Sequence, residues 1–158
     1  MSAAREHALN AALAGLHIGP GYEEWLAIVD GFYAEQVQVS SDATPGRLVG
    51  KARVKHALLK MLASLHAFSG EDSTSVSLRW MLMSGDRSNE YHSAWSLEIV
   101  GASGRNAAVR WCVRRIWRHG LVAHEHFYEN DVNGQAFAVD ADVFALEPIA
   151  AQERLPAC

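Results

Sequence analysis

Cysteine and proline are scarce in this sequence, and no long apolar run is present. The 158 residues include two cysteines and four prolines. Cys112 lies within a predicted strand and Cys158 is the last residue, so their number and placement do not indicate a disulfide framework. No apolar run approaches the roughly 20 residues of a membrane-spanning helix. These absences favour a reducing, cytoplasmic location, and we expect neither export nor membrane anchoring.

An excess of positive charge is also missing. The chain has 14 Lys and Arg residues against 18 Asp and Glu residues, with a formal net charge of -4 at pH 7. Nucleic-acid-binding proteins carry a basic surface, so we predict no nucleic-acid partner and interpret the locally basic segment 105–118 as the outer face of a strand. A chain of this length can bury a core as one domain, and we predict a single domain spanning residues 1–158.

Helical periodicity dominates the first half of the chain. Residues 2–16 combine good helix formers, and the Ile-Gly-Pro-Gly segment 18–21 ends that pattern. A second helix is predicted from Tyr22, and a third from Gly50 to Ser69. Apolar residues recur there at three- and four-residue steps: Trp25, Ile28, Val29, Phe32 and Tyr33 in the second helix, and Val54, Leu58, Met61, Leu65 and Phe68 in the third.

Apolar and polar residues alternate with a period of two in the remaining segments, as in half-buried strands. A short strand is predicted over 35–41, before a polar turn over 40–46, and a longer one over 74–84. Three strands within 89–131 form an antiparallel meander whose last turn is at His119-Gly120. Helices followed by a sheet are typical of an α+β fold, in which helices cover one face of the sheet. Residues 132–158 have no sustained period.

The alternation places two charged residues on the buried face of the meander, Arg115 and Glu125. A charged group costs several kcal/mol there unless it is paired or hydrated. Two interpretations stay open. In one, the two residues form a buried ion pair that braces the sheet; in the other, Glu125 acts as a general acid or base and Arg115 holds an oxyanion in a pocket. A β-bulge would place Arg114 on this face instead.

Three segments resemble the SnoaL-like branch of the nuclear-transport-factor-two-like superfamily. Tyr-Ala-Glu-Gln-Val-Gln-Val at 33–39 looks like the end of a helix and the first strand of the family. Leu-Val-Gly-Lys-Ala-Arg-Val at 48–54 looks like the start of its third helix, and 118–131 looks like its final strand. The resemblance covers about residues 22–131, which we take as the core of the domain, with 132–158 as a C-terminal extension of unknown structure. It implies an α+β cone, in which N-terminal helices pack on a curved antiparallel sheet around an apolar pocket, and dimers through the outer sheet face are common.

The resemblance also suggests where a site would lie. Asp42 precedes the third helix at an offset similar to that of the ketosteroid isomerases' proton-shuttling aspartate, although an aspartate there can also cap its own turn. Val113 stands where those isomerases have an oxyanion-hole acid, and the Arg-x-Asp pair of the limonene epoxide hydrolases has no counterpart. We expect aromatic and apolar side chains to line the pocket and to suit a flat ligand: Tyr33, Tyr91, Trp95, Trp111, Val113, Trp117 and Phe127.

The histidines of the last predicted strand suggest a further hypothesis, a metal site. His124 and His126 project to the same side of one strand, and His92 could be a third ligand. Their predicted outer face is more typical of solvent-exposed or interface histidines. The sequence contains no phosphate-binding glycine loop, nucleophile elbow or C-x-x-C motif. We predict no metal and no cofactor.

Three hypotheses about function follow. In the first, the protein is a lyase, isomerase or hydrolase that acts by acid-base chemistry on an apolar carbonyl or polyketide-like compound in the cone, with Asp42, Arg115 and Glu125 as catalytic residues. In the second, a homodimer joined through the outer sheet face binds such a ligand without chemistry, as a carrier, sensor or accessory protein. In the third, the interior is packed and the function lies on the outer face or in residues 132–158.

Overall fold

A computed structural model describes the helices, most of the sheet and few of the loops. The described residues are 2–16, 22–42, 44–69, 73–85, 89–101, 106–128 and 147–148. Cys158 and nearly all of the predicted C-terminal extension therefore lie outside the described residues.

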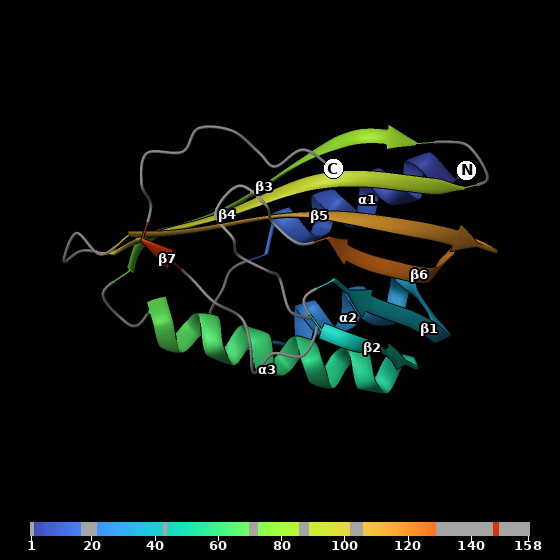
Figure 1. Cartoon of the computed structure of the whole chain (residues 1–158), viewed down its shortest axis with the longest axis horizontal. Helices are drawn as coiled ribbons and strands as arrows, with labels where there is room; N and C mark the ends of the chain where they lie inside the picture. Colours follow the sequence, from blue (N-terminus) through green and yellow to red (C-terminus); the bar gives the residue numbers. More distant parts are fainter. Residues whose placement is uncertain are drawn as a thin grey trace.

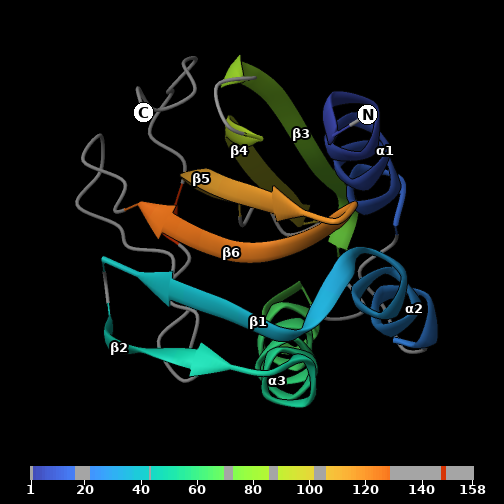
Figure 2. The ribbon, with the colours of Figure 1, turned by 90° about the vertical axis from the view of Figure 1, so that its right-hand side faces the viewer.

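The three helices of the described chain agree with the sequence periodicity, except that Tyr33, expected in the second helix, begins the first strand. They are α1 (Ser2–Ala14), α2 (Glu23–Phe32) and α3 (Lys51–Ser69). Glu23 and Glu24 occupy the first turn of α2, where negative charge complements the positive end of the helix dipole. Gly50 precedes α3 with φ +99°, a backbone conformation that favours glycine. All three helices lie on the concave side of a curved sheet (Figures 1 and 2).

The described strands form one sheet. They are β1 (Tyr33–Ser41), β2 (Thr44–Val49), β3 (Ser73–Gly85), β4 (Glu90–Gly101), β5 (Asn106–Arg118), β6 (Leu121–Tyr128) and β7 (Glu147–Pro148). Their order is β2-β1-β6-β5-β4-β3, and β7 pairs with β5. The predicted meander is confirmed as β4, β5 and β6, which pair antiparallel. Its last turn has φ 51° at His119 and 76° at Gly120, the positive angles of a type I′ hairpin.

Two expectations about the sheet need correction. The sheet is mixed and not purely antiparallel, because β1 pairs parallel to β6. Alternation shows which side chains share a face but not which distant strand lies alongside, so it could not reveal this pairing. The predicted polar turn over 40–46 is shorter than expected, because β2 begins at Thr44 and pairs with β1 as an edge strand. A short strand with little apolar alternation gives a weak sequence signal.

The register of the sheet decides which arginine faces the helices. The pairing of β4 with β5 continues without a shift from Glu90↔Ile116 to Val100↔Asn106, so no bulge exchanges Arg114 and Arg115. Arg115 lies directly opposite Glu125 and faces the interior, whereas Arg114 lies opposite His126 on the outer face. The inner face packs on the helices through a core of Leu9, Val29, Tyr33, Val37, Val39, Val54, Tyr91, Trp117 and Val122.

One further observation concerns the lack of long apolar runs noted in the sequence. None of the helices in the described ranges is long and apolar enough to cross a membrane. Cys112 is buried in β5.

Candidate functional site

Arg115 is the centre of a buried polar network on the inner face of the sheet. Its side chain is 3% exposed. Nε donates to Oε2 of Glu125 at 2.5 Å, while Nη1 donates to Oε1 of Glu6 at 2.9 Å and to Oδ1 of Asn10 at 2.5 Å. The guanidinium thus connects the neighbouring strand β6 with the N-terminal helix α1.

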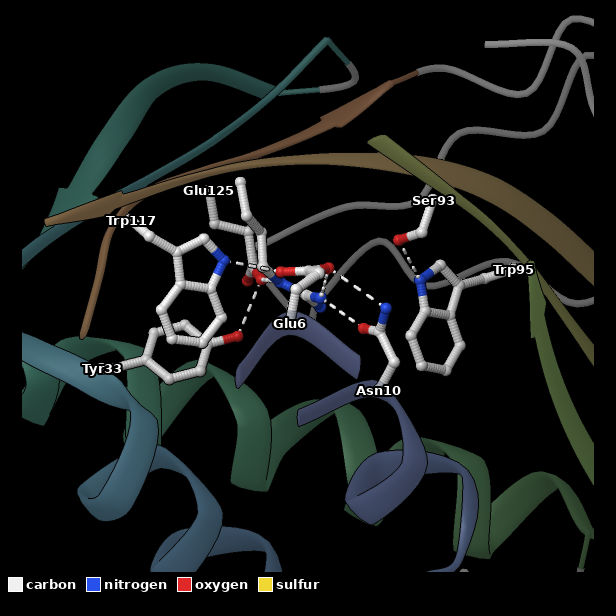
Figure 3. Close-up of polar contacts among 8 residues, drawn as sticks. Glu6, Asn10, Tyr33, Ser93, Trp95, Trp117 and Glu125 are labelled. Atoms are coloured by element: carbon white, nitrogen blue, oxygen red, sulfur yellow. Dashed lines mark hydrogen bonds and ion pairs between the residues drawn. The ribbon is translucent and has the colours of Figure 1, made fainter. Parts of the chain in front are cut away.

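Further hydrogen bonds complete this network (Figure 3). The indole Nε1 of Trp117 donates to Oε2 of Glu6 at 2.7 Å, and Nδ2 of Asn10 donates to Oε1 of Glu6 at 3.1 Å. The hydroxyl of Tyr33 donates to Oε2 of Glu125 at 2.7 Å. We call this set the Arg115 network; its members are Glu6, Asn10, Tyr33, Arg115, Trp117 and Glu125.

Burial and charge set the protonation states of two members. Burial alone would lower the pKa of Arg115, but the charges of Glu125 and Glu6 outweigh it and raise this pKa above its usual value. Burial also raises the pKa of Tyr33 well above its ordinary value, and the negative charge of Glu125 adds to that effect. Arg115 therefore remains a cation, and Tyr33 remains a neutral hydrogen-bond donor.

The sequence analysis did not identify the contribution of α1 to this site. Glu6 and Asn10 are 1% and 0% exposed, and Leu9 beside them is 0% exposed. Their four-residue spacing places Glu6 and Asn10 on one side of the helix, which was the available signal. Without the position of Arg115, two polar residues at that spacing indicate a solvated helix face.

The predicted pocket-lining residues share the inner face with the Arg115 network. Tyr91, Trp95, Trp111, Val113 and Trp117 are buried, as is Tyr33, and Phe127 packs partly buried against the core.

Three of the tryptophans form a row across β3, β4 and β5. Trp80 lies opposite Trp95, and Trp95 lies opposite Trp111. The ring centroids are 6.3 and 6.0 Å apart, and the rings of Trp95 and Trp111 are nearly parallel, with an interplanar angle of 8°. The Trp95 indole is also fixed by its hydrogen bond to Ser93 Oγ at 2.9 Å (Figure 3). We call these three residues the tryptophan row.

Asp42 lies apart from Arg115 and Glu125. It follows the end of β1, its side chain is 45% exposed, and its Oδ1 accepts a hydrogen bond from His126 Nε2 at 2.8 Å. His126 pairs opposite Arg114 on the outer face. The structure thus brings Arg115 and Glu125 together and places Asp42 on the other side of the sheet.

The outer face contains a pocket of about 280 Å³. The pocket is lined by Gln38, Ser40, Arg47, Arg114, Ile116, His124, Glu125 and His126. His92 lies on the same face but bonds to Glu90 and stacks on Tyr128. Among the described residues, no three His, Cys, Asp or Glu side chains are grouped to hold a metal ion.

Helices covering the concave face of a curved mixed sheet define an α+β cone fold. The chain has the α+β cone fold of solved nuclear-transport-factor-two-like proteins, which is the fold that the resemblance of its sequence implied. No family model matches the sequence, and no curated protein matches it.

Three solved structures show this likeness. A candidate polyketide cyclase from Pseudomonas putida is 16% identical, with a TM-score of 0.57 over 85% of this chain and 94% of that chain. A candidate polyketide cyclase from Xanthomonas campestris is 19% identical, with a TM-score of 0.55 over 82% and 90% of the two chains. A nuclear-transport-factor-two-like protein of unknown function from Cytophaga hutchinsonii is 13% identical, with a TM-score of 0.55 over 79% and 96%. Identities this low establish a common fold and leave function to the site.

Proposed function

We propose that this protein binds a flat apolar carbonyl or polyketide-like compound on the inner face of the cone. The observation that carries the proposal is the tryptophan row, three indoles in register on the same face as the Arg115 network. Aromatic rings of a ligand stack favourably on indoles, and small-molecule sites combine mostly apolar walls with a few convergent polar groups. The two candidate cyclases of the same fold are consistent with a ligand of this kind.

The Arg115 network would supply the polar end of the site. Its hydrogen bonds within the described part of the chain occupy Nε and Nη1 of Arg115 and Oε2 of Glu125, but neither Nη2 of Arg115 nor Oε1 of Glu125. Nη2 could donate to a carbonyl oxygen, and Oε1 could accept a hydrogen bond or take a proton. In the enzymatic form of the proposal, Glu125 removes a proton next to the carbonyl while Arg115 stabilises the oxyanion that develops.

A specific observation favours binding without chemistry as the second candidate function. Oε2 of Glu125 already accepts hydrogen bonds from Arg115 and from Tyr33, so these two contacts hold the carboxylate in place and occupy one of its oxygens. In this form the protein is a carrier, sensor or accessory protein. The homodimer through the outer sheet face that the sequence resemblance implies belongs to this form of the proposal.

Binding is tested with 9-fluorenone, a flat tricyclic ketone, by quenching of tryptophan fluorescence. The expected result is saturable quenching that weakens at least tenfold in Trp95→Leu and in Trp111→Leu. Trp25→Phe is the matched control, because Trp25 is buried in α2 outside the row. Circular dichroism checks that each variant is folded. If the folded Trp95→Leu and Trp111→Leu variants bind 9-fluorenone with the same affinity as wild type, the tryptophan row is not the binding site.

Chemistry is tested separately with 1-tetralone, an enolisable bicyclic ketone, in deuterated water. An enzyme that removes the proton next to the carbonyl accelerates deuterium exchange at that carbon, and nuclear magnetic resonance measures the rate. Glu125→Gln should abolish the acceleration while 9-fluorenone still binds. If both ketones bind and deuterium exchange is not accelerated, the non-catalytic function is selected. Light scattering of the same sample would test whether the protein is a dimer.

A further inference from the structure

A second constellation of reactive side chains lies on the outer face, across the sheet from the Arg115 network. Ser40 Oγ is 2.7 Å from Nδ1 of His126, and Nε2 of His126 is 2.8 Å from Oδ1 of Asp42. Ser40 pairs directly with His126 in the parallel β1–β6 register. Asp42 is two residues further along than Ser40, so it reaches the same side of the sheet. Two adjacent strands thus place a hydroxyl, an imidazole and a carboxylate in one chain of hydrogen bonds.

The carboxylate determines the tautomer of the neutral histidine. An ionised Asp42 can only accept a hydrogen bond, so Nε2 of His126 must carry the proton and donate it. Nδ1 is then an acceptor, and the Ser40 hydroxyl donates to it. This is the arrangement in which a histidine can remove a proton from a serine while a carboxylate holds the ring. The two ring nitrogens exchange the roles they have in the serine proteases, and such triads are defined by roles and not by atom names.

The same pocket offers groups that could stabilise an oxyanion. Ser40 and His126 line it together with Gln38 and Arg47. Arg47 Nη1 donates to Oε1 of Gln38 at 2.8 Å. Because arginine cannot accept, the amide oxygen of Gln38 must face Arg47, which leaves the amide Nε2 of Gln38 to donate elsewhere. A pocket of about 280 Å³ has room for a short acyl group and part of its alcohol.

We propose that this outer pocket is an acyl-transfer site that hydrolyses small carboxylic esters, with Ser40 as nucleophile, His126 as general base and Asp42 as the positioning residue for His126. Ser40 Oγ forms a bond to the ester carbonyl carbon, and its proton passes to Nδ1 of His126. The tetrahedral intermediate collapses as the bond to the alcohol oxygen breaks, and the imidazolium protonates the leaving alcohol. Water then attacks the acyl-serine, gives a proton to His126 and releases the acid as Ser40 recovers its own proton.

The first test is covalent. The full chain is treated with an alkyl fluorophosphonate, which loses fluoride to an activated serine, and the labelled peptide is identified by mass spectrometry. Label on Ser40 that disappears in His126→Gln is expected, because the hydroxyl reacts only when a base takes its proton. A label on another serine, or no label on Ser40, would overturn the proposal.

The second test is kinetic, with 4-nitrophenyl acetate as the probe ester. Ser40→Ala and His126→Gln should lower kcat/KM at least tenfold, and Asp42→Asn should lower it while the protein remains folded. His92→Gln is the matched control, since His92 lies on the same face outside the pocket and reports any unspecific hydrolysis by surface imidazoles. Equal loss in His92→Gln, or activity retained in Ser40→Ala, would refute the triad. Neither assay depends on ligand binding in the cone.

Discussion

The Arg115 network predicts that neighbouring arginines of β5 differ sharply in their effect on stability. Arg115→Met removes the cation that two carboxylates share, and Glu6, Arg115 and Glu125 have side chains only 1%, 3% and 4% exposed. Leaving buried carboxylates without their partner costs about 3–5 kcal/mol. Since a domain is stable by about 5–15 kcal/mol, this single change removes a large part of the total. For a chain of this size the melting temperature should fall by roughly 6–20 °C.

Arg114→Met is the matched control for that substitution. Arg114 pairs with Glu90 on the outer face, where the side chains are 38% and 32% exposed. A solvent-exposed ion pair contributes about 1 kcal/mol or less. The measurement is urea denaturation at pH 7, followed by circular dichroism, with the free energy of unfolding compared among wild type and both variants.

A rescue variant separates lost charge pairing from lost packing. Replacing Glu6 and Glu125 with glutamine in the Arg115→Met background leaves no buried charge in the Arg115 network, so at least half of the lost stability should return. The reasoning would be refuted if Arg115→Met cost no more than Arg114→Met, or if the triple variant were as unstable as Arg115→Met alone.

Three further predictions concern protonation and turn geometry. Hydrogen bonds, of which that from Arg114 has the largest effect, lower the pKa of Glu90 from 4.5 to about 2. The stability that ionised Glu90 adds to the folded protein is therefore lost as the pH falls through that range. A carboxyl titration by nuclear magnetic resonance should show a midpoint near 2 for Glu90 that rises in Arg114→Met. Burial raises the pKa of Tyr33, so the contribution of this tyrosine to the free energy of unfolding is present below pH 10 and lost above it. In alkaline buffers the free energy of unfolding should fall more steeply with pH in wild type than in Tyr33→Phe, and equal slopes would contradict this. Gly120 has φ +76°, so Gly120→Ala should lower the free energy of unfolding, measured by thermal denaturation, by about 1 kcal/mol. Gly31→Ala in α2 is the control and should not destabilise the protein, because a Cβ at Gly31 meets nothing within 4 Å.

The sequence alone determined the elements and the face of most residues within them. The helices, the meander and the inward position of Arg115 and Glu125 follow from alternation along single strands and from three- and four-residue repeats. These patterns are readable because they involve consecutive residues, whose geometry repeats every two or every 3.6 positions. The resemblance to the cone fold rests on the same local segments.

Only the tertiary structure decided which faces meet. Glu6 reaches Arg115 across 109 positions of sequence, and β1 lies parallel to β6, which brings Ser40 and Asp42 to His126. No local pattern specifies such contacts, because they depend on how the helices and strands pack against one another. The prediction of one site containing Asp42, Arg115 and Glu125 therefore became two arrangements. One is a buried ionic network on the inner face of the sheet, and the other is an accessible serine, histidine and aspartate on its outer face.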